Sequence, residues 1–509
     1  MKITGNSPFP PALLEKLSQR DPADPLKILF LASEIAPFAK TGGLADVANS
    51  LPKALTALGH DVRLVMPCYA SIPKNLLGKR LGTFMVYLGG NHLSGAVRLS
   101  TLPGSRVPVY LIEQGLYFAR SGLYQAGGRP YSDNLERFAF FSLSALEGVA
   151  QTGWLPDVIH CNDWHTALAP AFLKVSQRVN PACRGIPTVF TIHNLIYQGR
   201  FPGAQFYQTG LPERLFTPDY LEYYGDVNVM KAGIAFANRI STVSPQYAEE
   251  IQTPEGGWGL DGYLRTRSAD ISGILNGIDY AEWNPAEDPL IPAHFSRKNL
   301  RGKSRCKSAL QTDLGLPDKN VPLFGCVSRL VYEKGIDLLI DSLETLFREE
   351  LQLAVLGTGD SELERRLAEA SQRRPELLKV ILRYDEALAH QFYAGCDFFL
   401  MPSRSEPCGL SQMYSLAYGA IPVVRYTGGL ANSVRDATAR NLTDGKATGV
   451  VFREPAVEDF VHAVRRALEI YQDPERRRRL RKAGMAEDFS WERSSREYER
   501  LYREALAKP

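Results

Sequence analysis

Short apolar runs and amphipathic stretches alternate along this chain. In the first half, seven runs rich in β-branched and aromatic residues each end in a turn signal, at residues 26–33, 61–67, 107–113, 156–162, 187–194, 239–244 and 271–277. The segments between them place apolar residues three or four positions apart, as at Leu44, Val47 and Leu51. Runs that are apolar throughout are typical of strands buried on both faces. The pattern therefore predicts a parallel sheet covered by helices.

The same alternation restarts in the second half, with six runs at residues 322–329, 351–357, 378–384, 396–403, 420–426 and 448–452. We therefore predict an α/β protein made of two Rossmann-like, doubly wound parallel-sheet domains. The predicted segments are an extension at 1–25, domains at 26–290 and 321–489, and a polar, basic linker at 291–320 between the domains. Ligands of such sheets bind beyond the carboxyl ends of the strands. We accordingly expect one active site in a cleft between the domains.

Charge and cysteine content exclude several classes of protein. With 59 basic and 56 acidic residues, the net charge of +3 is too balanced to favour nucleic acid or an anionic membrane as partner. Seven scattered cysteines without a Cys-x-x-Cys pair favour a reducing compartment over a disulfide framework or a zinc site. No apolar run reaches the ~18 residues of a membrane helix. Residues 1–25 also lack the apolar core of a secretory signal, so we expect a cytoplasmic protein.

A Gly-Gly turn between an apolar run and a helical stretch occurs once in each half. The first is KTGGLADV, which starts at Lys40, and the second is TGGLANSV, which starts at Thr427. A turn without Cβ atoms lets backbone N–H groups approach a ligand, and the helix N-terminus behind it favours anions. Although one such turn is more often a plain tight turn, the pair could hold opposite ends of one phosphorylated ligand.

Three charged residues stand at predicted strand ends in the second half. Arg329 ends one strand and Lys334 precedes a helix, so both can reach the same pocket. A guanidinium fork with an ammonium point charge suits a diphosphate. The alternative is a pair of ordinary surface cations. Glu406 lies just before a helix N-terminus, where the dipole favours a carboxylate, and its alternative role is a helix-capping acid.

Histidines and carboxamides end two predicted strands of the first half, in HCNDWH (residues 160–165) and TIHN (residues 191–194). Their spacing matches no zinc signature, so we predict polar groups for a hydroxyl-rich ligand and no metal. The chain has no Walker loop, no Gly-x-Gly-x-x-Gly and no Gly-x-Ser-x-Gly. Their absence weakens kinase, dehydrogenase and hydrolase interpretations.

Seven motifs together resemble the bacterial glycogen (starch) synthases of glycosyltransferase family 5. In chain order they are KTGGLADVANSLPKAL, HCNDWHTALAP, TIHNLIYQG, ILNGIDYAEWNP, VSRLVYEKG, PSRSEPCGLSQMYSLAYG and TGGL. The resemblance runs from about Leu26 to the C-terminus. It implies the GT-B fold, in which the last helix, here 490–509, returns to the first domain. It also implies retaining transfer of glucose from ADP-glucose to the non-reducing end of an α-1,4-glucan such as glycogen, without a cofactor.

The resemblance also implies roles for residues at matching motif positions. Arg329 and Lys334 would neutralise the leaving diphosphate, and Glu406 would bind the donor glucose. Lys40 would face the phosphates and sugar, and His193 would lie beside the anomeric centre. Further donor-binding positions, including Tyr384 as the adenine-stacking ring, are Gly42, Gly43, Asp46, Asn276, Tyr384, Cys408, Gly409, Leu410, Thr427, Gly428 and Gly429. The acceptor or sugar side would contain Asp163, His165 and Asn194.

One departure separates this chain from neighbouring families, and three alternatives remain open. Many retaining GT-B enzymes carry a second Glu eight residues after the first, where this chain has Tyr414, a pattern that favours glycogen and starch synthases. The main alternative is a retaining transferase that uses UDP-glucose or another acceptor. A catalytically inactive glucan-binding protein would be expected to lack Lys40, Arg329, Lys334 or Glu406, all of which are present. A pyridoxal-phosphate phosphorylase is disfavoured because its lysine motif is not evident. The motifs leave the oligomeric state open.

Overall fold

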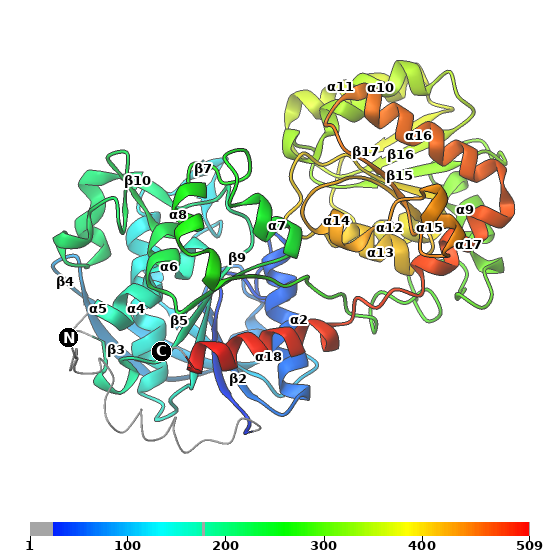
Figure 1. The fold of residues 1–509 in the computed structure, drawn as a ribbon. Helices are drawn as coiled ribbons and strands as arrows, with labels where there is room; N and C mark the ends of the chain where they lie inside the picture. Colours follow the sequence, from blue (N-terminus) through cyan, green and yellow to red (C-terminus); the bar gives the residue numbers. More distant parts are fainter. Residues whose placement is uncertain (1–23, 176–178, 508–509) are drawn as a thin grey trace, which may run out of the picture. The chain divides into compact units, whose positions relative to one another are not determined.

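The computed structural model describes residues 24–175 and 179–507, which divide into two compact units (Figure 1). Within the described residues, unit 1 contains 24–243, 248–277 and 491–507. Unit 2 contains Ser244–Tyr247 and Ile278–Ser490. The predicted N-terminal extension, residues 1–25, lies outside the described residues except for its last two positions.

Unit 1 is built on a nine-stranded sheet in the order β14-β13-β9-β8-β1-β2-β5-β4-β3. Seven of these strands are mutually parallel and confirm the seven runs predicted from the sequence. They are β1 (Lys27–Leu31), β2 (Asp61–Pro67), β5 (Pro108–Glu113), β8 (Val158–Asn162), β9 (Thr188–Ile192), β13 (Arg239–Thr242) and β14 (Ile271–Gly273). Strands β8 and β9 are buried along their whole length, as continuous apolar runs require.

The remaining two strands, β3 (Lys79–Leu88) and β4 (Asn91–Thr101), are antiparallel and make the sheet mixed, whereas the sequence pattern predicted parallel strands alone. At the C-terminal end of β3, buried Phe84, Val86 and Leu88 alternate with exposed residues. Gly89 and Gly90 join the strands with φ angles of 55° and 88°. A two-residue loop with both φ angles positive is typical of a tight hairpin, and such an edge can face water on one side.

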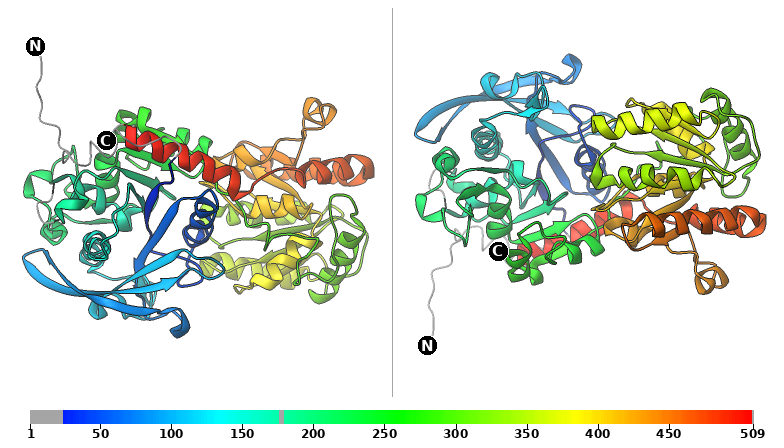
Figure 2. Two further views of the ribbon diagram at one scale, coloured as in Figure 1. Left: turned by 90° about the horizontal axis from the view of Figure 1, so that it is seen from below. Right: turned by 90° about the horizontal axis from the view of Figure 1, so that it is seen from above.

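The longer helices of unit 1 are α2 (Gly43–Ala57), α4 (Asn134–Ala150), α5 (Leu168–Val175), α6 (Val229–Phe236) and α18 (Trp491–Ala507). The C-terminal helix α18 lies beside α2 and against β8, β9 and β13 (Figure 1, Figure 2). The Tyr502 hydroxyl at its buried face lies 2.8 Å from Nδ1 of His160 on β8. Shorter elements are α3 (Gly115–Phe118), α8 (Asp261–Thr266), β6 (Gln125–Ala126), β7 (Arg129–Pro130), β10 (Arg200–Pro202), β11 (Glu222–Tyr223) and β12 (Asp226–Asn228). The short helix α7 (Pro245–Glu250) begins in unit 2 and ends in unit 1.

Unit 2 is built on a six-stranded parallel sheet in the order β17-β16-β15-β18-β19-β20. Counted within the unit, this order is 3-2-1-4-5-6, the order of the Rossmann fold. The strands confirm the six predicted runs and are β15 (Leu323–Val327), β16 (Gln352–Leu356), β17 (Leu378–Ile381), β18 (Phe398–Met401), β19 (Ile421–Arg425) and β20 (Val450–Phe452). Figure 1 shows α10 (Ile336–Leu346), α11 (Ser361–Arg373) and α16 (Val457–Gln472) on one face. The opposite face carries α9 (Arg301–Asp313), α12 (Glu386–Gly395) and α13 (Ser411–Ala417). The remaining helices are α14 (Gly428–Ser433), α15 (Ala439–Thr443) and α17 (Pro474–Gly484).

The segment 291–320, predicted as a linker, is part of unit 2, and the division between the units falls at Gly277–Ile278 and Ser490–Trp491. Within that segment, α9 packs on α12. Its Lys303 is 3% exposed, and Nζ donates hydrogen bonds to the carbonyl groups of Tyr393, Ala394 and Tyr418. A stretch that is polar and basic in sequence therefore forms a helix with a buried face. Its lysine can be buried because carbonyl oxygens accept hydrogen bonds from the ammonium group.

All seven cysteine positions lie in the described residues, and all seven are free thiols. None of the helices in the described parts of the chain has both the length and the hydropathy of a membrane span.

Candidate active site

The strand order of each unit brings predicted site residues together. In unit 2 the order reverses between β15 and β18, which are followed by Arg329 and Lys334 and by Glu406, respectively. In unit 1 it reverses between β1 and β8, which are followed by the first Gly-Gly turn and by Asp163. Open α/β sheets bind ligands beyond the carboxyl ends of their strands at such reversals. Each unit thus presents its candidate groups at the edge where a ligand is expected.

Lys334 and Glu406 form the centre of the unit 2 group. Lys334 Nζ donates a hydrogen bond to Glu406 Oε1 at 2.7 Å, and Ser403 Oγ donates to Oε2 at 2.8 Å. The side chains of Lys334 and Glu406 are only 16% and 8% exposed, so the pair is shielded from water. Gly335, with φ of 67°, turns the chain from Lys334 into α10. A carboxylate with a donor on each oxygen is held in one orientation.

Arg329 lines the same pocket as this pair. The pocket has a volume of about 180 Å³ and its lining includes Ser328, Arg329, Lys334, Ser403, Glu406 and Leu410. The Arg329 side chain is 52% exposed, and its Nη2 lies 3.9 Å from Oε2 of Glu333, a long surface ion pair of little energetic weight. Two cations and one carboxylate therefore meet in one pocket at the end of β15.

The second Gly-Gly turn supports the loop that carries Glu406. A Cβ on Gly428, whose φ is 42°, would lie 2.1 Å from the Glu406 carbonyl oxygen, and one on Gly429 would lie 1.9 Å from that of Cys408. The Gly429 N–H donates to the Glu406 carbonyl at 3.0 Å. These glycines are thus required by backbone packing within unit 2.

Gln412, which the sequence did not single out, also holds this loop. Its Nε2 donates to the carbonyl oxygens of Cys408 and Gly409 at 3.0 and 3.1 Å, and to Ser433 Oγ at 3.1 Å. Gln412 is fully buried, and Gly409, with φ of 69°, leaves room for its side chain. The backbone at Cys408 and Gly409, two of the three predicted positions, is therefore held by a buried side chain.

The first Gly-Gly turn is anchored differently, through Glu34, another residue that the sequence reasoning missed. This 4%-exposed carboxylate accepts hydrogen bonds from the N–H groups of Thr41 and Gly42 and, at 2.6 Å each, from the hydroxyls of Thr41 and Tyr124. Two turn N–H groups predicted to face a ligand thus face an internal carboxylate. In contrast to Gly428, a Cβ on Gly42 or Gly43 would meet no heavy atom within 4 Å, so space lies open in front of this turn.

Lys40 and Asp46 flank that turn and form an ion pair with each other. Lys40 Nζ lies 2.7 Å from Asp46 Oδ1, and the side chains are 39% and 31% exposed. Asp46 lies in the first turn of α2, where a carboxylate is favoured by the helix dipole. The pair places a cation beside the open face of Gly42 and Gly43.

His193 and Asp163 meet where β8 and β9 end. Asp163 Oδ1 accepts the His193 N–H at 2.7 Å, and His193 Nε2 lies 2.9 Å from Asn162 Oδ1. Asn162 donates its own Nδ2 to Leu31, so the Nε2–H of His193 is the donor to Oδ1. Burial lowers the pKa of His193 to about 3, and the ring is neutral near pH 7. Its Nδ1 therefore carries a lone pair that can accept a hydrogen bond.

Asp163 has an unusual backbone and an unusual carboxyl group. Its φ of 54° is positive, and the burial of its carboxyl raises the pKa to about 7, opposed by the N–H groups of His193 and Asn194. Asn194 also uses its Oδ1 to accept the N–H of Ile196 at 3.1 Å. Both predicted sugar-side residues thus lie at the end of the sheet and stabilise the turn that carries His193.

Three further predicted residues differ in exposure. His165 is 8% exposed and packs among aromatic rings, with centroids 4.0 Å from Trp164 and 4.6 Å from Tyr124, and its Nδ1 has no hydrogen-bond partner among the described residues. Asn276 is 6% exposed, and its Oδ1 has no hydrogen-bond partner among the described residues, a vacancy that a ligand hydroxyl could fill. Tyr384 is 74% exposed and offers a ring face for stacking.

Comparison with known proteins identifies the family of this chain. Residues 27–266 match the family model of the starch synthase catalytic domain, and residues 313–486 match that of the glycosyl transferases group 1. Glycogen synthase 1 of Methylococcus capsulatus is 48% identical over 95% of this chain and 97% of its own length. The glycogen synthase of Moorella thermoacetica is 45% identical over 95% and 98%. The chain belongs to the glycogen synthase family.

Solved structures support the same assignment of fold and family. The catalytic domain of starch synthase IV from Arabidopsis thaliana, bound to ADP and acarbose, is 36% identical. It superposes with a TM-score of 0.86 over 95% of this chain and 100% of that one. Sucrose-phosphate synthase from Thermosynechococcus elongatus, at 19% identity and a TM-score of 0.57 over 95% and 99% of the two chains, shares the fold. The chain is thus a GT-B enzyme, a glucosyltransferase of glycogen synthesis.

Tyr414 is not among the residues that line the pocket of Glu406. Its ring stacks on Trp283 with centroids 3.8 Å apart, and the ring of Trp283 stacks on His390, also at 3.8 Å. The position that holds a second Glu in many retaining GT-B enzymes is thus occupied by one ring of a three-ring stack. A carboxylate at position 414 would lose that stacking.

Substitution by alanine should affect the stability of the protein differently at the two Gly-Gly turns. Gly428→Ala should lower the free energy of unfolding by about 1–3 kcal/mol, because its Cβ would collide with the Glu406 carbonyl at a positive φ. Gly42→Ala should change it by no more than about 0.5 kcal/mol, because Gly42 is extended and faces open space. Urea denaturation of both variants checks this, and equal losses would contradict it.

Buried histidines should make this glycogen synthase sensitive to acid. Burial lowers the pKa values of His160, His165 and His193, so below pH ~6.5 the unfolded chain binds protons that the folded one does not. Each costs about 1.4 kcal/mol of stability per pH unit. Between pH ~4 and 7, the raised pKa of Asp163 has the opposite effect, because the folded chain holds a proton that the unfolded chain has lost. Asp163 therefore offsets the stability loss from about one histidine. The net loss is therefore about 3 kcal/mol per pH unit below 6.5.

Calorimetric melting between pH 7.5 and 5 measures this loss. Asp163→Asn should make stability fall more steeply with decreasing pH, by the contribution of about one proton, because the carboxyl group that offsets one histidine is gone. Replacing the exposed His92 with glutamine serves as the control and should leave the slope unchanged. A melting temperature that stays constant from pH 7 to 5 would exclude the effect.

Proposed function

We propose that this enzyme transfers glucose from ADP-glucose to the 4-hydroxyl at the non-reducing end of an α-1,4-glucan, with retention at the anomeric carbon and without a metal or cofactor in the chemistry. The observation that carries the proposal is the pocket at the strand-order reversal of unit 2. Arg329 and Lys334 line it together with Glu406, which is held by Lys334 and Ser403.

This pocket matches the charge that develops during glycosyl transfer. Cleavage of the bond between sugar and diphosphate leaves negative charge on ADP and positive charge on the glucose. The Arg329 fork and the Lys334 point charge suit the two phosphates, and groups that are already fixed stabilise the transition state without reorganisation. Glu406 keeps acceptor capacity beyond its bonds to Lys334 and Ser403, which suits the hydroxyls of the donor glucose.

The groups of unit 1 suit a sugar. Neutral His193 offers Nδ1 as an acceptor, and Asn276 offers a buried Oδ1, so a hydroxyl can donate to either. Open space in front of Gly42 and Gly43, beside the ammonium of Lys40, leaves room for close approach of a donor. These features support donor and sugar binding by unit 1 residues.

Glu406 is the one carboxylate among the described residues that line the pocket. A double displacement needs two carboxylates about 5–5.5 Å apart, and this pocket contributes one. The proposal has the acceptor hydroxyl approach on the face from which the diphosphate leaves, which retains the anomeric configuration. The ADP in the Arabidopsis structure supports an adenine nucleotide as donor.

The test is ADP release from ADP-glucose in the presence of glycogen, with UDP-glucose in a parallel reaction. NMR of the lengthened glucan reports the configuration of the new linkage. Release with ADP-glucose and an α-1,4 product is expected. Turnover with UDP-glucose alone would overturn the donor, a β-linked product would overturn retention, and no turnover with either donor would favour a glucan-binding protein.

A further inference from the structure

A second group of ligand-type side chains lies in unit 2 on the helix α12 and the segment that follows Gly277. Glu386 and His390 are four residues apart on α12 and therefore share one face of the helix. Glu282 approaches them from the other segment. One carboxylate oxygen of each glutamate and a ring nitrogen of the histidine all lie within 4.8 Å of one another. None of the three lines the pocket of Glu406.

His390 is held in a fixed orientation by a buried acid. Its Nδ1 lies 2.8 Å from Asp288 Oδ2, which also accepts the Tyr418 hydroxyl at 2.5 Å, while Asp288 Oδ1 accepts the N–H of Leu290 at 2.8 Å. Because Asp288 acts as acceptor throughout, the proton of the histidine resides on Nδ1. Stacking on Trp283, at 3.8 Å and 16°, fixes the plane of the ring.

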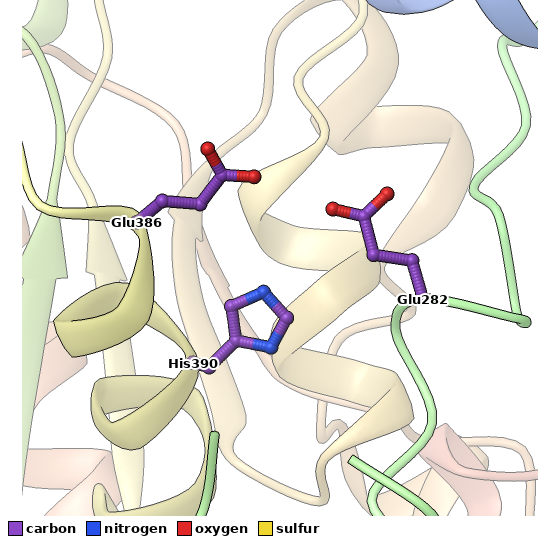
Figure 3. Close-up of side chains that lie close together, drawn as sticks. All are labelled: Glu282, Glu386 and His390. Carbon is purple, nitrogen blue, oxygen red and sulfur yellow. The ribbon is translucent and has the colours of Figure 1, made fainter. Parts of the chain in front are cut away.

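The other ring nitrogen, Nε2, is left with its lone pair. His390 is 1% exposed, and Nε2 has no hydrogen-bond partner among the described residues. Figure 3 shows a ring nitrogen of His390 turned toward the space between the carboxylates of Glu282 and Glu386. A buried histidine with one nitrogen bonded to a carboxylate and the other aimed at further carboxylates is the arrangement typical of metal ligands.

We propose that Glu282, Glu386 and His390 bind a divalent transition-metal ion of the Zn²⁺ class. One imidazole nitrogen and two carboxylate oxygens suit such ions, and the two negative charges balance the ion. Metal–ligand distances of about 2.0–2.2 Å require closer approach than 4.8 Å, which the exposed glutamates can provide by rotation while His390 stays fixed. Water completes the coordination.

The ion would link α12 to the segment that carries Trp283. It would also compete with an existing contact of Glu386, because the Tyr384 hydroxyl donates to Glu386 Oε2 at 3.0 Å. The site therefore lies next to the ring that is predicted to stack on adenine. The binding experiment below does not depend on the donor, so the proposed function and this site can fail independently.

The test is titration of the chelator-treated full-length enzyme with Zn²⁺ in a calorimeter. One ion per chain is expected, and the double variant Glu282→Gln, Glu386→Gln should weaken binding at least tenfold. Both glutamates are exposed, so this variant should fold, which its melting temperature verifies. Glu287→Gln, at an exposed glutamate of the same segment, is the matched control and should bind as the unchanged enzyme does. No binding, or equal binding by the double variant, would overturn the site.

Co²⁺ supplies a second readout. Its visible spectrum should show nitrogen and oxygen ligands without a thiolate charge-transfer band, and the ion should quench the fluorescence of Trp283, which stacks on the ligand ring. Quenching should disappear in the double variant. A thiolate band would assign the ion to a cysteine and overturn the proposal.

Discussion

Lys334→Ala is expected to lower kcat for ADP release by about 10²–10³-fold, the usual cost of removing one fixed group that stabilises transition-state charge. Lys334 is held within 2.7 Å of Glu406 in a shielded pocket, so its ammonium stands ready before the diphosphate begins to leave. Lys319→Ala, at an exposed lysine of the same unit, is the matched control and should keep full activity. A tenfold loss or less would remove Lys334 from the chemistry.

Loss of Lys334 also affects stability, and a second variant separates the two effects. The single change leaves the Glu406 side chain, 8% exposed, without the cation that pairs with it, which commonly costs about 3–5 kcal/mol. Lys334→Met combined with Glu406→Gln removes both charges, and the amide oxygen can still accept the hydroxyl of Ser403. The double variant should regain most of the melting temperature of the unchanged enzyme. A melting temperature as low as that of Lys334→Ala would mean that the unpaired carboxylate is not the cause of the instability.

Much of the fold follows from local patterns of the sequence. Each of the 13 apolar runs became a parallel strand, because a strand buried on both faces must be apolar throughout. The hairpin β3–β4 was missed although Gly89-Gly90 marks its turn, because only the end of β3 alternates clearly. The helix α9 falls within the segment that the sequence predicts as a linker, because Lys303 is polar in sequence although it is buried and bonded to three carbonyl groups.

The candidate site was predictable where a residue directly follows a strand. Arg329, Lys334 and Glu406 could be placed because strand ends of a parallel sheet converge at one edge, and the structure brings them to one pocket. Glu34 and Gln412 could not, because their roles depend on tertiary contacts that carry no local signal. Glu34, for example, meets Tyr124, which is 90 positions away in the chain.

Arg329→Ala is expected to lower kcat/KM for ADP-glucose by about 10²–10³-fold, with a smaller effect on the melting temperature than Lys334→Ala has. The reason for the difference from Lys334 is exposure: the Arg329 side chain is 52% exposed, and its ion pair with Glu333 is 3.9 Å long. A surface pair of this kind contributes about 0–1 kcal/mol to folding. Its half-exposed guanidinium can therefore reach a bound diphosphate.

The variant Arg329→Lys tests whether Arg329 acts through paired contacts of its guanidinium or only through its positive charge. If both N–H edges of the guanidinium contact phosphate oxygens, a lysine should recover only a small part of the activity, because an ammonium cannot form the paired contact. Arg348→Ala, at an exposed arginine of the same unit, should behave as the unchanged enzyme. Full recovery by lysine would reduce the role of Arg329 to that of a point charge. An inactive Arg348→Ala would point instead to a general effect of lost surface charge.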